Sequence, residues 1–314
     1  MINPNINITM DEIVIKKITE KDIKEILDFF NTERGKSFSY RYFKKKYSTD
    51  WVNEPLLGFA GYNKENIVGL CGTTLYRFGK YTLAQCGDLV MARVCRGKGY
   101  FSQMLSALQQ EAMNRKIDGI FVTPNEQARP VYEHKQGWQR IGEFYIFDFD
   151  VKTYPLLKTL NYFNYHWHYF SVLKTWINNK ILSRFTNPDV NNGKICVKID
   201  ADYLQYKTYG HYSCLTYGDK VLLWSLSDGM VIVYSEVQTA DELQQEIAFL
   251  HKYCKKRGIH KFSYSCYSNS ALCELLKSKY AGKEEIPVYY YPINSEIETS
   301  KLLFHRIDKN AFDV

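Results

Sequence analysis

The chain has 314 residues, of which 45% are hydrophobic and 24% are charged. These values are ordinary for a folded protein of one or two domains. The net charge of +7 favours an anionic ligand. Because no basic block is longer than Lys44–Lys46 and acidic residues are interspersed along the chain, the sequence argues against nucleic acid as a partner. No apolar run approaches the ~20 residues that a membrane span needs.

The cysteines and the N-terminus predict a cytoplasmic location. Eight cysteines are widely spaced, and none is paired as Cys-x-x-Cys, so we expect free thiols in a reducing compartment and no metal site. His166 and His168 lie two residues apart, on different faces of a helix, and are poor candidates for a shared metal. Residues 1–5 lack the basic start and the apolar run of a signal peptide.

The first 150 residues alternate between strand and helix patterns. Thr19 predicts a helix N-cap with Asp22 at the reciprocal position of a capping box. A short helix at 39–47 carries Lys44–Lys46, which we expect to form a solvated face. The other elements expected in this half are strands 12–17, 57–62, 67–77, 82–91, 119–123 and 140–150 and helices 23–30, 102–116 and 126–132.

The turn Arg96-Gly97-Lys98-Gly99 lies between an expected strand and an expected helix. Its two glycines let the backbone approach a ligand, its cations add positive charge, and the following helix presents its N-terminal N–H groups. These properties predict a cradle for a pyrophosphate, and the alternative is a basic surface turn. Tyr100 stands where a P-loop needs Lys-Ser/Thr after its last glycine, and Ser102 stands where a dinucleotide loop needs its third glycine.

The residues after the next expected strand point to a family. Asn125, Ala128 and Tyr132 are followed by Gly137-Trp138. Together with the Arg-Gly-Lys-Gly turn, residues 12–150 resemble the GNAT superfamily of acyl-CoA-dependent N-acyltransferases. Its signature is Gln/Arg-x-x-Gly-x-Gly/Ala, then Asn-x-x-Ala-x-x-x-Tyr, then Gly-Phe. The resemblance implies a mixed central sheet flanked by helices, and acetyl-CoA or another short-chain acyl-CoA as co-substrate.

Two departures from the signature narrow the resemblance. Phe101 replaces a small residue, and one extra residue separates Tyr132 from Gly137. Both departures, with Gly87-Asp88 and Pro124-Asn125-Glu126, resemble a two-domain subgroup that acylates nucleotide-linked amino sugars for bacterial surface polysaccharides, such as the O-antigen of lipopolysaccharide. This implies transfer of an acetyl or short 3-hydroxyacyl group to a dTDP- or UDP-linked amino sugar. The alternatives are an N-acetyltransferase for a protein, peptide or small amine, and a non-catalytic coenzyme-binding protein.

The resemblance also implies site residues. The residues expected to bind the coenzyme are Leu89, Val90, Met91, Arg96, Gly97, Lys98, Gly99, Tyr100, Phe101 and Asn125. Asp88 is the expected general base, because it is a lone carboxylate in an apolar run; alternatively it points to solvent or bonds a neighbouring loop. Tyr132 is the expected acid for the departing thiolate, with His134 as a substitute. The structural alternatives are a packed Tyr132, a surface His134 and an Asx turn at Asn125.

The rest of the chain predicts two further parts. Apolar residues recur at helical spacing in 151–193, which we interpret as an aromatic-rich linker helix, with an amphipathic helix at a membrane surface as the alternative. Residues 194–314 repeat the order of 57–150: three strands (211–217, 220–226, 231–237), a helix (240–256), a strand (261–266), a helix (269–279) and a strand (286–291). Residues 236–241 carry no glycine and no cation, so we expect a degenerate GNAT-like domain that binds no coenzyme. It would wall the acceptor site or form a homodimer.

Overall fold

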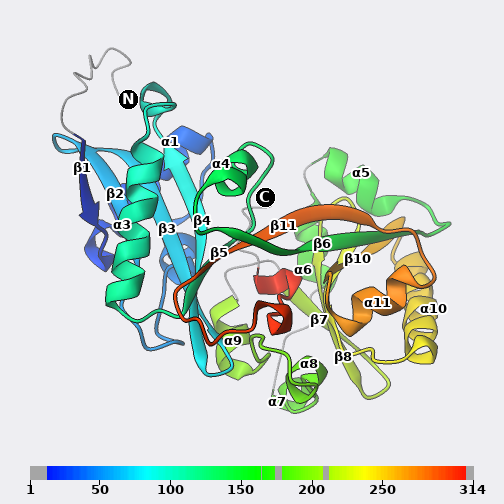
Figure 1. The fold of residues 1–314 in the computed structure, drawn as a ribbon. Coiled ribbons are helices and arrows are strands. Elements are labelled where there is room, and N and C mark those ends of the chain that lie inside the picture. Colours follow the sequence, from blue (N-terminus) through cyan, green and yellow to red (C-terminus); the bar gives the residue numbers. More distant parts are fainter. Residues whose placement is uncertain (1–12, 164, 174–178, 208–211, 309–314) are drawn as a thin grey trace. The chain divides into compact units, whose positions relative to one another are not determined.

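The computed structural model describes residues 13–163, 165–173, 179–207 and 212–308 (Figure 1). The chain divides into two compact units. The first unit contains residues 1–122 and 290–297, and the second contains residues 123–289 and 298–314. Strand β11 (Lys283–Pro292) begins in the second unit and ends in the first, and β6 (Gln139–Asp150) belongs to the second. The sequence-based boundaries at residues 150 and 193 stay predictions.

The first unit is a mixed sheet with three helices. Its remaining elements are β1 (Ile13–Lys17), α1 (Ile23–Arg34), α2 (Tyr40–Lys46), β2 (Gly58–Asn63), β3 (Asn66–Phe78), β4 (Tyr81–Met91), α3 (Tyr100–Asn114) and β5 (Gly119–Val122), with 3-10 turns at Glu20–Asp22 and Arg93–Cys95. The strand order is β1-β2-β3-β4-β5, followed by the end of β11. Strands β1 to β4 pair antiparallel, and β4 pairs parallel with β5.

Two local predictions for the first unit are confirmed. The Asp22 carboxylate accepts a hydrogen bond from the Thr19 N–H (2.7 Å), which is the reciprocal bond of a capping box, and another from the Thr19 hydroxyl (2.8 Å). Helix α3 packs against the sheet with the face that its apolar spacing predicted: Met104, Leu105, Leu108 and Ala112 are buried.

The expectation of a solvated Lys44–Lys46 face is wrong for one of its members. Lys44 is exposed, but the side chain of Lys46 is only 1% exposed. The reason is helical spacing: Lys46 lies three residues after Phe43, which is also buried, and so shares the inward face of α2. An ammonium on that face needs a partner, and it has one.

The second unit is also a mixed sheet with helices. Besides β6 and β11, it contains α4 (Arg129–His134), α5 (Leu156–Tyr162), α6 (His166–Leu173), α7 (Asn179–Leu182), α8 (Pro188–Asn191), α9 (Ala201–Tyr206), β7 (Tyr212–Tyr217), β8 (Lys220–Leu226), β9 (Met230–Ser235), α10 (Ala240–Lys256), β10 (Lys261–Tyr267) and α11 (Ala271–Lys277), with 3-10 turns at Thr299–Lys301 and Arg306–Asp308. The strand order is β11-β6-β10-β9-β8-β7. The expected succession of three strands, helix, strand, helix and strand is present.

The two sheets share a pairing pattern. Strands β7, β8 and β9 are antiparallel and β9 pairs parallel with β10, as β2, β3 and β4 are antiparallel and β4 pairs parallel with β5. The connection from β9 to α10 differs from the β4–α3 connection. It ends in a capping box between Thr239 and Glu242 and carries a buried Glu236, whose carboxylate accepts from the backbone N–H of Val221 (3.1 Å).

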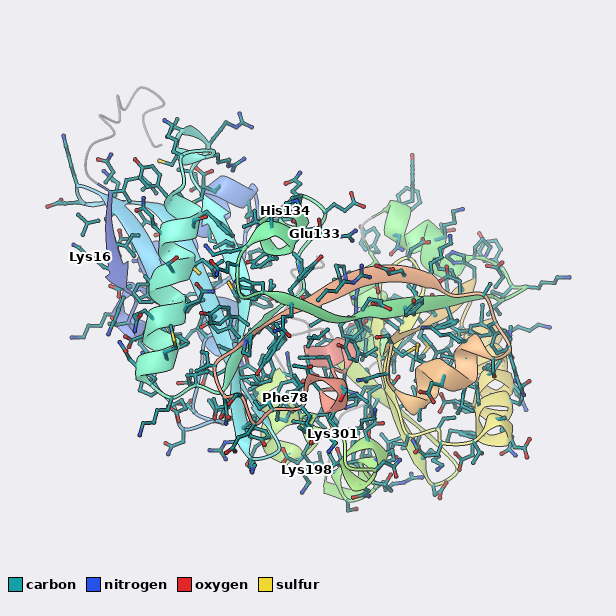
Figure 2. The ribbon with its side chains drawn as sticks, viewed as in Figure 1. Lys16, Phe78, Glu133, His134, Lys198 and Lys301 are labelled. Atoms are coloured by element: carbon teal, nitrogen blue, oxygen red, sulfur yellow. The ribbon has the colours of Figure 1, made fainter. Side chains whose placement is uncertain are left out.

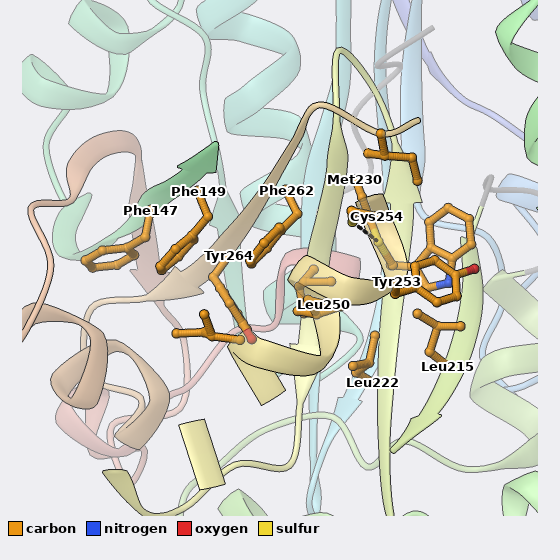
Figure 3. Packing of buried hydrophobic residues seen from close by; sticks show 14 of the residues in the cluster. Phe147, Phe149, Leu215, Leu222, Met230, Leu250, Tyr253, Cys254, Phe262 and Tyr264 are labelled. Atoms are coloured by element: carbon orange, nitrogen blue, oxygen red, sulfur yellow. Dashed lines mark hydrogen bonds between the residues drawn. The ribbon is translucent and has the colours of Figure 1, made fainter. Parts of the chain in front are cut away.

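The core of the second unit combines aromatic with aliphatic side chains (Figure 3). Phe149 of β6 stacks on Phe262 of β10 with ring centroids 5.0 Å apart. The Cys254 thiol of α10 lies 3.8 Å from the Met230 sulfur of β9, so this helix packs directly on the strand. Much of the high aromatic content thus serves core packing.

The described residues within 151–193 do not form a single linker helix. The described residues fold into the short helices α5, α6, α7 and α8. Helix α5 ends at Tyr162, which with Asn161 and Phe163 makes a run of poor helix formers. The apolar residues that suggested the helix also differ in environment, since Leu157 is buried and Phe163 is 59% exposed.

Candidate active site

The Arg96–Gly99 turn has the backbone of an anion-binding loop. Gly97 and Gly99 adopt φ angles of 75° and 81°, in the left-handed region that favours glycine. A Cβ at either position would meet nothing within 4 Å, so both glycines serve conformation and not packing. Gly99 is the N-cap of α3, a 15-residue helix, and the first N–H groups of a helix have no acceptor within the helix, which makes a helix N-terminus suitable for an anion.

Arg96 joins this turn to the end of β4. Its Nε donates to the Met91 carbonyl (3.0 Å), and its Nη2 lies 3.4 Å from the Glu33 carboxylate of α1. The side chain remains 54% exposed. A ligand at the turn can therefore reach the guanidinium while Arg96 keeps its backbone contact.

Strand β4 leaves its parallel neighbour halfway along. Pairing with β5 joins Leu83, Ala84 and Gln85 to residues 119–121, and within the described residues it extends no further. The register against β3 shifts between Cys86 and Asp88, which makes Gly87 a bulge. Among the described residues, 89–91 pair with β3 alone. That Leu89, Val90 and Met91 bind the coenzyme stays a prediction.

Asp88 is buried next to the bulge and does not point to solvent. The residue is 2% exposed. Its two oxygens lie 2.8 Å and 2.7 Å from Lys46 Nζ, and Oδ2 accepts a 2.5 Å hydrogen bond from the Tyr47 hydroxyl. Gly72 faces Asp88 on β3 and makes room for the phenol, because a Cβ there would collide with the Tyr47 ring and oxygen.

Burial shifts the pKa values of side chains in this cluster. It lowers the pKa of Lys46 from 10.5 to about 8, although the Asp88 carboxylate acts in the opposite direction. Burial, with the nearby Asp88 charge, raises the pKa of Tyr47 well above its usual value. The Cys71 thiol, hydrogen-bonded to Cys86 beside the cluster, also has a raised pKa. Near neutral pH, Tyr47 is thus a phenol and Cys71 a thiol.

Lys46 and Tyr47 were missed by sequence reasoning. The available signal was the spacing of Phe43, Lys46 and Tyr47, which places all three on one helical face. A lysine on an apolar face indicates a buried partner, and the lone carboxylate Asp88 in an apolar strand was the matching half. Their separation of 42 residues hid the pair.

The other expected site residues lie in the second unit. The Asn125 side chain accepts from the Ala128 N–H (2.9 Å), which is the Asx turn that was the alternative to coenzyme binding. Tyr132 is 1% exposed and packs against Trp138 and Tyr289, with ring centroids 4.8 Å and 6.2 Å away. His134 is exposed at the last position of α4, beside Glu133 (Figure 2).

No group of three or more His, Cys, Asp or Glu side chains within the described residues is arranged to hold a metal ion. No helix among them has the length and apolarity to cross a membrane.

Residues 21–138 match the acetyltransferase (GNAT) family, by a comparison with family models. The matched segment begins in the Thr19 capping turn, includes the Arg96–Gly99 cradle and ends at Trp138. This match covers less than half of the chain. The predicted fold, a mixed central sheet flanked by helices, is confirmed. The matched family consists of acetyltransferases, whose co-substrate is acetyl-CoA.

Solved structures with the same fold extend over both units. A probable N-acyltransferase from Enterococcus faecalis gives a TM-score of 0.64 at 12% identity, covering 90% of this chain and 73% of its own. A GCN5-related N-acetyltransferase from Kribbella flavida gives 0.59 at 11% identity with the same coverages. A putative acetyltransferase from Pyrococcus horikoshii gives 0.53 at 13% identity and covers 96% of both chains. The comparison with curated proteins found no match.

Proposed function

We propose that the protein is an acyl-CoA-dependent N-acyltransferase whose acceptor is the amino group of a nucleotide-linked amino sugar. The observation that carries the proposal is the arrangement along β4. Within the first unit, a buried carboxylate (Asp88), an unpaired strand edge (Leu89–Met91) and an anion-binding turn (Arg96–Gly99) follow one another. These features supply a place for an amine, a thioester and a pyrophosphate in that order.

The coenzyme is held by the turn and by β4. The N–H groups of the turn and of the start of α3, with Arg96 and Lys98, bind the pyrophosphate. Tyr100 and Phe101 begin α3 next to it. The edge of Leu89–Met91 binds pantetheine, and a backbone N–H there faces the thioester carbonyl. Asn125, already engaged in its Asx turn, is a weaker candidate for a coenzyme contact.

The reaction is a direct attack of the amine on the thioester. The ammonium form of the acceptor first loses a proton to the Asp88 cluster, and the neutral nitrogen then bonds to the thioester carbon. A backbone N–H donor stabilises the resulting oxyanion, a contribution of about 3 kcal/mol for one well-placed donor. The attacking nitrogen, now cationic, gives up a second proton as the C–S bond breaks, and the thiolate takes a proton from an acid, which leaves a neutral amide and a neutral thiol. Tyr132 and His134 are the candidates for that acid.

The acceptor class rests on the sequence. Gly87-Asp88, Arg96–Phe101 and Pro124-Asn125-Glu126 match the pattern expected of nucleotide-amino-sugar acyltransferases, and the net charge of +7 suits a doubly anionic acceptor and coenzyme. The acyl group is acetyl or a short 3-hydroxyacyl chain. We further propose that the second unit binds no coenzyme, because the β9–α10 connection carries Glu236 in place of a glycine cradle. Its role is to complete the acceptor site or to form a homodimer in the cytoplasm.

The test is thiol release from acetyl-CoA and 3-hydroxybutyryl-CoA against a panel of dTDP- and UDP-linked amino sugars. Turnover of one sugar nucleotide supports the proposal. Turnover restricted to peptide amines or aminated small molecules overturns the acceptor class and keeps the enzyme class. Coenzyme binding without turnover of any amine leaves a coenzyme-binding protein. With an active acceptor, Tyr132→Phe and His134→Ala identify the acid, which is the residue whose loss lowers kcat without weakening coenzyme binding.

A further inference from the structure

We propose that Lys46 is the final proton acceptor of the reaction and that Asp88 relays the proton to it from the acceptor amine. This inference rests on the proposed function, since it assigns a further residue to the same site. Lys46 acts through Asp88 and holds the carboxylate in place. The family resemblance pointed to Asp88 alone; the geometry assigns the role to a pair.

The Asp88 carboxylate already accepts several hydrogen bonds. Lys46 Nζ contacts both oxygens at 2.8 Å and 2.7 Å, and the Tyr47 hydroxyl bonds Oδ2 at 2.5 Å. A carboxylate that accepts several hydrogen bonds, one of them from an ammonium, is stabilised as the anion. The Asp88 carboxylate by itself is thus a weak proton acceptor, although its contact with Lys46 lets it transfer a proton to that side chain.

Burial of the Lys46 side chain favours its neutral form. Lys46 is 1% exposed, and a buried ammonium is costly unless it is paired. Burial is the largest influence on its pKa, which falls to about 8, with the positive charge of Arg34 on α1 acting in the same direction. Deprotonating Lys46 leaves one net negative charge in the cluster, and an acceptor ammonium arriving at Asp88 compensates that charge.

Two of the groups that face the pair, Tyr47 and Cys71, hold their protons near neutral pH. The elements around it are α1, α2, β3 and β4, which contribute Arg34, Tyr47, Cys71 and Cys86. The pKa of Tyr47 is raised well above its usual value by burial and by Asp88, and that of Cys71 is raised by its hydrogen bond to Cys86 and by burial. Lys46 is therefore the member of the cluster whose pKa is brought close to physiological pH.

The proposed transfer balances without any further reactant. The acceptor ammonium gives a proton to one Asp88 oxygen, and the carboxyl group gives a proton to the unprotonated Lys46 Nζ. The products are a neutral amine, which attacks the thioester, and a Lys46 ammonium paired with the Asp88 carboxylate. That ion pair is the arrangement seen in the structure. Lys46 returns its proton to solvent between turnovers.

The decisive variant is Lys46→Arg. Arginine preserves the positive charge and the contact with Asp88, but it does not lose its proton below a pH of about 12. We expect kcat to fall about 100-fold, a typical contribution of a proton-transfer residue, with no change in the Kd of acetyl-CoA. Lys46→Met removes both charge and proton acceptor and should lose at least as much activity. Lys44→Met, on the exposed side of the same helix, is the matched control and should behave as wild type.

The pH profile separates proton transfer from a structural role. The amine of the acceptor titrates as well, so wild type and variants are compared with one acceptor. In wild type, kcat/KM should rise with pH through a limb near pH 8 that corresponds to Lys46. Lys46→Arg should lack this limb. A variant with wild-type kcat and an unchanged limb would overturn the inference, because it would show that a fixed positive charge is sufficient.

A direct titration needs no acceptor at all. NMR of the full chain with ¹³C-labelled lysine, with the Lys46 signal assigned by its absence from Lys46→Arg, should give a midpoint near pH 8. A midpoint at or above 10.5, the ordinary lysine value, overturns the inference whatever the acceptor proves to be. Failure of wild type to acylate any amine overturns the proposed function itself. An active wild type with an insensitive Lys46→Arg overturns the inference alone.

Discussion

Lys46 Nζ and the Asp88 carboxylate form a bidentate ion pair at 2.8 Å and 2.7 Å, with both side chains almost completely removed from solvent. The pair joins the end of helix α2 to the bulged part of strand β4. Desolvating two charges offsets most of the attraction between them, so such a pair is weak evidence for a purely stabilising role. Its place next to residues 89–91 of β4 instead fits the proposed role in proton transfer.

Replacing Asp88 with Asn should lower turnover by at least about tenfold, because the amide cannot accept a proton from the amine. The Kd of acetyl-CoA should stay within about twofold of wild type, since the pyrophosphate turn lies beyond the end of β4. Steady-state thiol release and calorimetric titration of the coenzyme provide the two measurements. Asp28→Asn, at an exposed position on α1, is the control for the same chemical exchange.

The Asp88 variant also leaves the Lys46 ammonium buried without its counter-ion, at a cost of about 3–5 kcal/mol. The double variant Lys46→Met/Asp88→Asn removes both charges and should recover much of the lost stability without recovering turnover. Wild-type turnover in Asp88→Asn would remove this carboxylate from the mechanism. Loss of coenzyme binding in a folded double variant would place the defect in the cradle.

Gly72→Ala should lower turnover by displacing Tyr47. A Cβ at Gly72 would overlap the phenol that donates to Asp88, and Asp88 is the cross-strand partner of this glycine. Tyr47→Phe removes the same hydrogen bond without moving the backbone and should give a smaller loss. Comparison of kcat for the two variants tests whether the phenol positions the carboxylate. Equal, wild-type values for both would contradict that role.

The sequence predicted the fold better than it predicted the site, and the difference has a physical cause. Periodicity is a local property, so it placed α10 at residues 240–256 and the inward face of α3 correctly. The Lys46–Asp88 pair depends on two elements meeting across 42 residues, and neither residue identifies the other in sequence. In residues 151–193, apolar spacing predicted helix, but it could not show where Asn and aromatic residues would end one helix.

Gly99→Ala should weaken coenzyme binding, whereas Gly79→Ala should not. Gly99 and Gly79 both have positive φ angles, of 81° and 60°, and both have open space where a Cβ would lie. Alanine at either site should therefore cost about 1–2 kcal/mol of stability through backbone strain. Only Gly99 caps α3 at the proposed pyrophosphate site, whereas Gly79 turns the β3–β4 hairpin.

The measurements for this pair are thermal unfolding and the Kd of acetyl-CoA. We expect similar losses of unfolding free energy in the two variants and a Kd at least about tenfold higher for Gly99→Ala alone, because the first N–H groups of the helix would be displaced. An unchanged Kd for Gly99→Ala would reject the Arg96–Gly99 turn as the cradle. An equal rise in Kd for Gly79→Ala would trace the effect to general destabilisation.

Glu246 should make the stability of the second unit depend on pH. It is fully buried on α10, where it accepts hydrogen bonds from the Ser235 hydroxyl (2.9 Å) and the Tyr264 hydroxyl (2.8 Å). Burial raises its pKa from 4.5 to about 7 in the folded protein, against the effect of these hydrogen bonds. The folded state thus holds a proton that the unfolded state releases above pH 4.5. The free energy of unfolding should fall as the pH rises from about 4.5 to about 7 and level off above that.

Glu246→Gln should remove this dependence, since glutamine resembles the protonated acid and stays neutral. The variant should match wild type near pH 4.5 and exceed it at pH 8 by up to about 3 kcal/mol, the equivalent of the raised pKa. Urea unfolding at a series of pH values measures the difference. The same exchange at Glu274, which is exposed on α11, is the matched control. A Glu246→Gln variant with the wild-type slope would mean that Glu246 is already ionised in the folded protein, held by Ser235 and Tyr264.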